Sequence, residues 1–150
     1  MILIEDTRNK IDKHRRKRQC FENLGHQVVR TKLLIGDYSL LHNQTICIDT
    51  KQDWVEVANN LCGKQHERFR NECVKAKTCG IKLVILVEDK TPVAEWKSPL
   101  KRNKMPYTQV SGTTLSKIID TMHQKYGVEF INCAKGESAD KILEILGVEK

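Results

Sequence analysis

The apolar and polar positions of the chain form blocks that predict strands and helices in turn. Residues 2–5 and 27–34 have the apolar and β-branched content of strands. Residues 81–87 are almost uninterruptedly apolar, which predicts a central strand covered on both faces. Residues 128–133 predict a last strand.

Helical patterns lie between these strands. A basic helix is expected from residue 9 to residue 24, and Gly25 ends it. Residues 64–79 form another, with Phe69, Cys73 and Ala76 at spacings i, i+4 and i+7. Gly80 is its expected terminator.

Three further helices are predicted by stripes and caps. Asp53 and Glu56 have the spacing of a capping box, ahead of a helix that Gly63 stops. Ser138 is expected to cap the final helix. The helix after Asp53 has an apolar stripe formed by Trp54, Val57, Ala58 and Leu61. The third helix lies between these two in the sequence, and its apolar stripe is formed by Leu115, Ile118, Ile119, Met122 and Tyr126.

Residues 36–41 and 45–51, joined by a short polar turn, predict a β-hairpin. Gly36 permits a tight turn into Asp37, which is expected on the first strand. Side chains alternate faces along a strand, so Cys47, Asp49 and Lys51 share one face of the second strand. Ile46 and Ile48 point to the other face.

The hairpin carries the candidate chemistry. Two carboxylates, from Asp37 and Asp49, can hold a divalent metal through hard oxygen ligands. Lys51 beside them can position or deprotonate the attacking water, which indicates metal-assisted phosphodiester hydrolysis. An acid followed by Asp-x-Lys is also common by chance, and the alternative is a solvated hairpin with a surface Asp–Lys contact.

Strands that alternate with helices predict an α/β sandwich around a mixed sheet, as one domain over residues 1–150. No apolar run approaches the roughly 20 residues of a membrane span. Met1 to Ile4 run directly into Glu5 and Asp6, so no signal peptide is predicted. We expect a cytoplasmic protein, encoded by a bacterium or a phage.

The formal net charge of +7 favours a polyanionic partner, and nucleic acid is the commonest.

The six cysteines form no CxxC pair, so we expect reduced thiols and no zinc. Residues 91–106 hold all three prolines and predict an irregular connection. Basic residues gather in two runs: Lys10, Lys13, Arg15, Arg16, Lys17 and Arg18, and Lys97, Lys101, Arg102 and Lys104.

These motifs resemble the nuclease domain of the XPF family of structure-specific endonucleases, within the PD-(D/E)xK superfamily. Gly36-Asp37-Tyr38 is similar to the family's GD motif, and Asp49-Thr50-Lys51 to its ERK. Asp6-Thr7-Arg8 is similar to its DxRE, and Arg68-Phe69 to the arginine-bearing helix before the central strand. The resemblance implies a restriction-endonuclease-like three-layer α/β/α sandwich with a central mixed sheet.

The chain departs from the family pattern at three positions. Asp49 replaces a glutamate and reaches one methylene less, and Thr50 replaces an arginine, which removes a cation. Asn9 replaces the glutamate of DxRE, so the resemblance does not carry a second metal site. No helix-hairpin-helix or helicase module is predicted within the sequence.

Residue roles follow from the resemblance. Asp37 and Asp49, with the backbone carbonyl of Thr50, would bind Mg²⁺ or Mn²⁺, and Lys51 would orient the nucleophile or stabilise the transition state. Asp6 would belong to the catalytic set, binding the metal through water or supporting the site; the alternative is a helix-start or turn residue. Glu5 takes its place if the register of the first strand differs. The expected DNA contacts are Arg8, Arg68, Lys13, Arg16, Lys101 and Arg102.

The resemblance implies an Mg²⁺-dependent endonuclease that cleaves branched, flap or nicked DNA and leaves 5′-phosphate and 3′-hydroxyl ends. The alternative is a catalytically silent DNA-binding subunit of a nuclease complex. Family nuclease domains commonly dimerise, so a homodimer is expected. Its interface is expected on the late helices, which have the richest apolar stripes.

Overall fold

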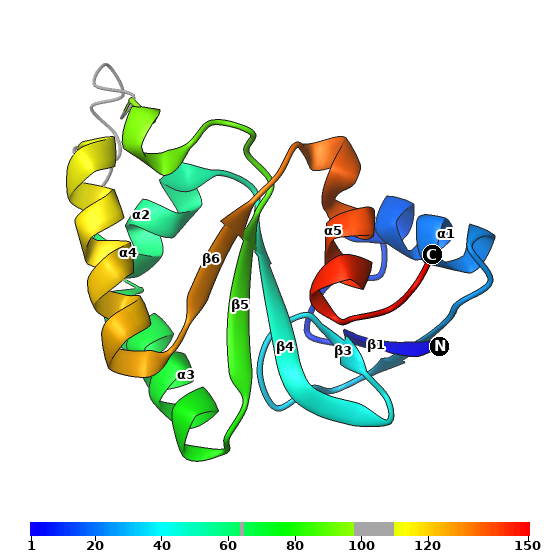
Figure 1. Ribbon diagram of the computed structural model, residues 1–150. Helices are drawn as coiled ribbons and strands as arrows, with labels where there is room; N and C mark the ends of the chain where they lie inside the picture. The colour runs from blue at the N-terminus through cyan, green and yellow to red at the C-terminus, as the bar shows by residue number, and fades with distance from the viewer. Residues whose placement is uncertain (64, 98–109) are drawn as a thin grey trace.

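The computed structural model describes residues 1–63, 65–97 and 110–150, and these contain one six-stranded sheet (Figure 1). The order of the strands across the sheet is β2-β1-β3-β4-β5-β6. Their bounds are β1 Ile2–Asp6, β2 Gln27–Thr31, β3 Tyr38–Leu40, β4 Asn43–Lys51, β5 Lys82–Val87 and β6 Glu129–Asn132.

The sheet is mixed, as the sequence predicted. Strand β3 runs antiparallel to both β1 and β4, and it forms the expected hairpin with β4. The other three pairs, β1–β2, β4–β5 and β5–β6, are parallel. The hairpin therefore places the end of β4 in the middle of the sheet, next to β5.

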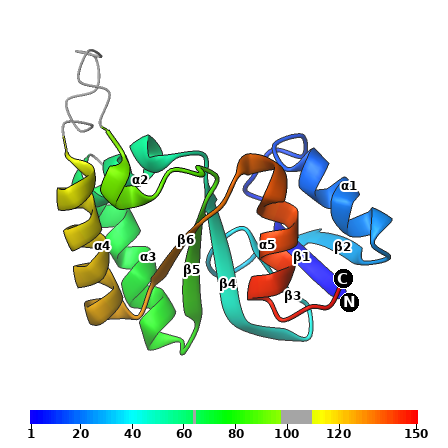
Figure 2. The ribbon, with the colours of Figure 1, turned by 45° about the horizontal axis from the view of Figure 1, so that its top comes forward.

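Helices cover both faces of the sheet and complete three layers. Helices α2 Trp54–Cys62, α3 His66–Thr78 and α4 Gly112–Tyr126 lie on one face, and α1 Arg15–Asn23 and α5 Ser138–Ile145 lie on the other (Figures 1 and 2). Short 3-10 turns, η1 Val93–Glu95 and η3 Lys135–Glu137, precede α4 and α5. The α/β/α sandwich is confirmed.

Strand β5 connects two apolar cores. Leu83, Ile85 and Val87 pack with α2, α3 and α4, whereas Val84 and Leu86 pack with α1 and α5. All five side chains are buried. The prediction of a strand covered on both faces is thus confirmed, because each face meets its own layer of helices.

The first helix begins later than expected. Helix α1 starts at Arg15 rather than at residue 9, and its end before Gly25 agrees with the prediction. The preceding turns are fixed by side chains instead, since Arg8 binds Asp6 and Asn9 binds Asp37. These contacts hold the segment at the end of β1 and the start of β3, and α1 begins only after it.

Two other boundaries differ from the predictions. Strand β2 ends at Thr31, where its partner β1 ends at Asp6, and the amide of Leu33 binds the Asp6 carboxylate instead of a strand. Ser138 is the first residue of α5 rather than its cap. Its hydroxyl donates to the carbonyl of Lys135.

The capping box at α2 is half formed. Asp53 accepts a hydrogen bond from the amide of Glu56 at 2.9 Å, as expected. The carboxylate of Glu56 accepts from the amide of Gln52 at 2.8 Å, and not from the amide of the cap residue Asp53.

Among the described residues, none of the helices is long and apolar enough to cross a bilayer.

Candidate active site

The cavity at the carboxyl end of β4 has a volume of about 310 Å³ and brings the predicted hairpin residues together. Asp37, Asp49 and Lys51 all line it. Thr50 and Asp6 line the same cavity, whose walls come from the segment after β1, the start of the hairpin, α2 and α3. All five residues of the GD and Asp-x-Lys motifs therefore line one cavity.

Asp49 and Lys51, which both line this cavity, form an ion pair. Oδ2 of Asp49 lies 2.9 Å from Nζ of Lys51, because alternation along β4 puts both side chains on one face. Burial raises the pKa of Asp49, the nearby Asp37 carboxylate raises it further, and Lys51 opposes both only in part. Asp49 is thus a carboxylate whose charge the protein leaves incompletely compensated.

Lys51 keeps its proton at neutral pH. Burial lowers the pKa of its ammonium, but the Asp49 carboxylate and the more distant Glu56 and Asp37 outweigh this and raise the pKa above its ordinary value. A lysine of this kind is a poor general base. It is suited to hold a positive charge and hydrogen-bond donors toward the cavity.

Asp37 stays ionised because three donors hold its carboxylate. Oδ2 accepts from the amide and the hydroxyl of Thr50 at 2.9 and 2.7 Å, and Oδ1 accepts from Nδ2 of Asn9 at 2.6 Å. Burial raises the pKa of Asp37, but these hydrogen bonds outweigh burial and lower the pKa below its ordinary value. The carboxylates of Asp37 and Asp49 thus have opposite pKa shifts.

Gly36 allows the chain to deliver Asp37 to the site. Its φ is +77°, in the left-handed region that glycine tolerates, as the tight turn required. A Cβ atom at this position would lie 2.8 Å from the carbonyl oxygen of Ile48. The same oxygen accepts a hydrogen bond from the amide of Asp37 at 2.7 Å. The turn at Gly36 is therefore joined closely to the backbone of β4. Asp37 immediately precedes β3 rather than lying within it.

Asp6, rather than Glu5, faces the candidate site. Oδ2 of Asp6 accepts from Nε of Arg8 at 2.6 Å, and Oδ1 accepts from the amide of Leu33 at 2.7 Å. The Glu5 carboxylate lies elsewhere, where Arg30 and Arg18 contact it. The contacts of Asp6 indicate that it fixes the wall of the cavity.

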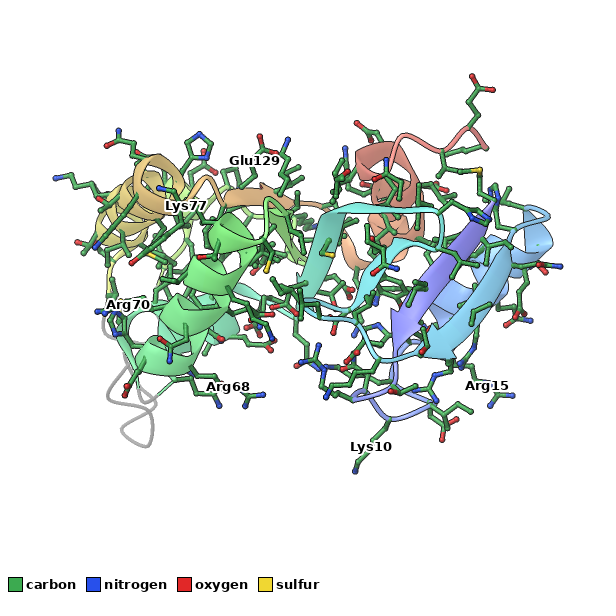
Figure 3. All side chains as sticks on the ribbon, turned by 90° about the horizontal axis from the view of Figure 1, so that it is seen from below. Lys10, Arg15, Arg68, Arg70, Lys77 and Glu129 are labelled. Atoms are coloured by element: carbon green, nitrogen blue, oxygen red, sulfur yellow. The ribbon has the colours of Figure 1, made fainter. Side chains whose placement is uncertain are left out.

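The predicted DNA-contacting cations divide into three groups. Arg8, Lys13 and Arg68 line the cavity. Arg16 is exposed and lines a separate hollow of about 850 Å³ between α1 and the start of α5. Lys101 and Arg102 lie outside the described residues. Figure 3 shows Arg68 on α3 and Lys10 on the segment after β1 extending toward the same side of the molecule.

Glu72 is a residue of the cavity that the motifs did not indicate. It accepts the amide of Gly36 at 3.2 Å and thereby joins α3 to the hairpin turn. Among the described residues no salt bridge joins it to Arg68, the partner that a helix surface would offer. The available signal was its spacing of four from Arg68, beside the apolar stripe of Phe69 and Cys73.

The donor set suits a metal that keeps much of its own water. In the described part of the chain, no group of three or more His, Cys, Asp or Glu side chains is placed to hold an ion. Asp37 and Asp49 nevertheless line one cavity, and the charge of Asp37 raises the pKa of Asp49. Mg²⁺ is commonly held by one or two carboxylates with water and phosphate completing its shell, so these residues fit it.

The layered mixed sheet and the position of the acids at the end of the hairpin define a restriction-endonuclease-like α/β fold. The family model of the ERCC4 domain matches residues 5–145. The chain therefore belongs to the ERCC4 domain family, which confirms the resemblance seen in its motifs.

Solved structures of an archaeal relative show the same fold. XPF from Aeropyrum pernix matches with a TM-score of 0.68 and 20% identity, and its complex with DNA matches with 0.65 and 21%. Each match covers 97% of this chain, which spans 63% of the length of those chains. None of the curated proteins matched the chain.

Proposed function

We propose that this chain is a metal-dependent DNA endonuclease that hydrolyses phosphodiester bonds in branched, flap or nicked DNA. The carrying observation is that Asp37, Asp49 and Lys51 line one cavity, with Asp49 and Lys51 paired at 2.9 Å. Membership of the ERCC4 domain family supports the reaction class. The structure of the Aeropyrum pernix relative with DNA supports the choice of polymer.

In this proposal Asp37 and Asp49 hold Mg²⁺ or Mn²⁺, and the carbonyl of Thr50 adds a ligand. The bound cation would supply Lewis-acid stabilisation of the charge that develops on the scissile phosphate. Lys51 directs its ammonium toward that charge and orients the attacking water, because its raised pKa keeps it protonated. Asp6 holds Arg8 and Leu33, and through them the wall of the site.

The cations around the cavity provide the contacts to DNA. Lys13 and Arg68 line the cavity from different elements, one from the segment before α1 and one from α3. Such contacts neutralise backbone phosphates and carry no sequence information. The substrate would therefore be chosen by the shape of the DNA rather than by its bases.

A catalytically silent DNA-binding subunit is the second candidate function. The observation in its favour is that protein groups already engage both acids: Asp37 accepts three hydrogen bonds and Asp49 is paired with Lys51. Under this proposal the cavity would be a structural remnant, and the surrounding cations would still bind DNA.

One experiment separates the two functions. Purified protein is incubated with flap, fork, Holliday-junction and plain duplex DNA in Mg²⁺, in Mn²⁺ or in EDTA. Asp49→Ala and Lys51→Ala are tested beside the wild-type chain. Glu22→Ala on α1 and Lys75→Ala on α3, both exposed and outside the lining of the cavity, are the matched controls.

Cleavage that needs the metal, is lost in both site variants and persists in both controls supports the enzyme. Labels on each DNA end would show whether the products carry 5′-phosphate and 3′-hydroxyl. DNA binding without cleavage under any of these conditions supports the silent subunit. Failure to bind any of the DNAs at low salt contradicts both functions.

We also propose that a second copy of the chain is a partner. Ile118, Ile119, Met122 and Tyr126 of α4 are only partly buried, although they pack at the margin of the core. A second copy would cover this outer helix. Light scattering across a range of protein concentrations tests this, and a monomer at all concentrations contradicts it.

A further inference from the structure

The carboxylate of Asp37 has one acceptor direction left open. An ionised carboxylate offers about four lone-pair positions. The Thr50 amide and hydroxyl occupy Oδ2, and Nδ2 of Asn9 occupies one position on Oδ1. The remaining position is therefore on Oδ1, the oxygen that Asn9 holds at 2.6 Å.

Asn9 is itself fixed at two further points. Its side-chain oxygen accepts from Nζ of Lys13 at 3.2 Å, and its backbone carbonyl accepts from Nη2 of Arg30 at 2.6 Å. Arg30 in turn contacts the fully buried Glu5 at 3.1 Å. An anion on one side and a cation on the other define which end of the amide faces Asp37.

We propose that Asn9 is a positioning residue, which orients the Asp37 carboxylate so that only one lone pair of Oδ1 is presented to a divalent cation. This inference rests on the proposed function and deepens it. Asn9 is a neutral donor, so it holds Asp37 before a cation arrives and adds no negative charge to the site. Without Asn9, a bound cation would itself have to fix the orientation of the Asp37 carboxylate. The hydrogen bond from Asn9 fixes that orientation in advance.

Loss of this hydrogen bond leaves the carboxylate held through Oδ2 alone. Substitution of groups that orient metal ligands typically costs about 10- to 100-fold in metal affinity or activity. We expect Asn9→Ala to weaken Mn²⁺ binding by that factor. DNA binding in EDTA should change by much less than Mn²⁺ binding, since all the phosphate-contacting cations are retained and only Lys13 loses a side-chain contact.

Asn9→Asp replaces the neutral amide donor by a carboxylate of nearly the same size and shape. A carboxylate would then face Asp37 at hydrogen-bond distance, and the two like charges would repel each other. A divalent cation relieves this repulsion. The melting temperature of Asn9→Asp should fall in EDTA and should rise on adding Mn²⁺ by more than that of the wild-type chain.

The test measures Mn²⁺ affinity by calorimetry and thermal unfolding with Mn²⁺ or EDTA. The chains are the wild type, Asn9→Ala, Asn9→Asp and the control Asn71→Ala, whose exposed side chain lies on α3 outside the cavity lining. A purely structural role of Asn9 would lower the melting temperature of both variants equally, with or without Mn²⁺. The proposed role predicts that Mn²⁺ separates them.

Three outcomes overturn the inference: wild-type Mn²⁺ affinity in Asn9→Ala, an equal Mn²⁺-induced shift in Asn9→Asp and Asn9→Ala, or a wild-type chain that takes up no Mn²⁺. The last outcome also overturns the proposed function. Mn²⁺ uptake that depends on Asn9, in a chain that cleaves none of the DNAs, overturns the proposed function and supports the inference.

Discussion

The ammonium nitrogen of Lys51 lies 2.9 Å from Oδ2 of Asp49, and each side chain is only 12% exposed. Two residues apart on β4, they point into the same cavity as Asp37. A carboxylate with a raised pKa beside a lysine with a raised pKa forms a polarised pair. The pair places opposite charges next to a second acid, Asp37, which accepts three hydrogen bonds.

This pair predicts that Lys51 contributes to the cleavage rate and not to metal binding, and substitution can separate the two effects. Lys51→Met should lower the cleavage rate by about 100- to 1,000-fold, because a buried charge-stabilising donor is lost. At a pH well above neutral, where Asp49 is ionised even without Lys51, its Mn²⁺ affinity should not weaken, since a like charge is removed from beside the cation. Single-turnover cleavage and calorimetry measure the two quantities.

Lys51→Arg is the matched variant, because it keeps the positive charge and changes the shape. It should retain part of the activity. An unchanged rate in Lys51→Met, or loss of Mn²⁺ binding in step with the rate, would contradict the assigned role.

Gly36→Ala should destabilise the chain and misplace Asp37. The φ of +77° costs a side-chain-bearing residue about 1 to 3 kcal/mol. The new Cβ would also meet the Ile48 carbonyl at 2.8 Å, and that carbonyl is fixed by the Asp37 amide. Urea unfolding measures the change.

Gly136→Ala is its control, because a Cβ atom there meets nothing within 4 Å. It should shift the free energy of unfolding by less than about 0.5 kcal/mol. Equal stabilities of the two variants would contradict the close approach at Gly36.

The sequence was sufficient for features that local periodicity controls. The run that became β5 and the alternation that put Asp49 and Lys51 on one face need only a few neighbouring residues. The turn at Gly36 is equally local, since a positive φ favours glycine. These elements carry the fold and three residues of the site.

Features that depend on distant partners were beyond local patterns. Helix α1 starts later than predicted because Arg8 and Asn9 bind groups that are distant in the sequence. Arg8 binds the carbonyl of Leu33, 25 residues away, and Asn9 binds Asp37, 28 residues away. Helical spacing showed which face of α3 carries Glu72, but the amide that it binds lies at Gly36, on another element. Such contacts follow from tertiary packing, which periodicity does not specify.

His14 should make the stability depend on pH below neutrality. Burial lowers the pKa of its imidazole to about 4, with Lys17, Lys13 and Arg18 adding to this and Asp37 opposing it. The ring lies edge-on to Tyr38 at 5.3 Å, and within the described structure neither ring nitrogen has a hydrogen-bond partner. The folded chain therefore holds the neutral form.

The sign follows from linkage. The unfolded chain takes up a proton as pH falls through about 6.5, whereas the folded chain does so only near 4, so stability is lost between these values. The loss from this group should be about 2 kcal/mol between pH 7 and pH 5. His14→Phe should remove it and His42→Phe, at an exposed turn, should keep it; equal pH profiles in urea unfolding would contradict the assignment.

Lys13 and Arg68 should each contribute one phosphate contact. For DNA binding in EDTA, Lys13→Gln and Arg68→Gln should each weaken affinity for all DNA shapes and reduce the salt slope by about 1. Lys77→Gln is the matched control, because Lys77 lies on the opposite side of the molecule from Arg68 and Lys10 (Figure 3). Fluorescence anisotropy at several salt concentrations measures the slopes. If Lys77→Gln reduced the slope as much as the other two, binding would follow net charge rather than the wall of the cavity.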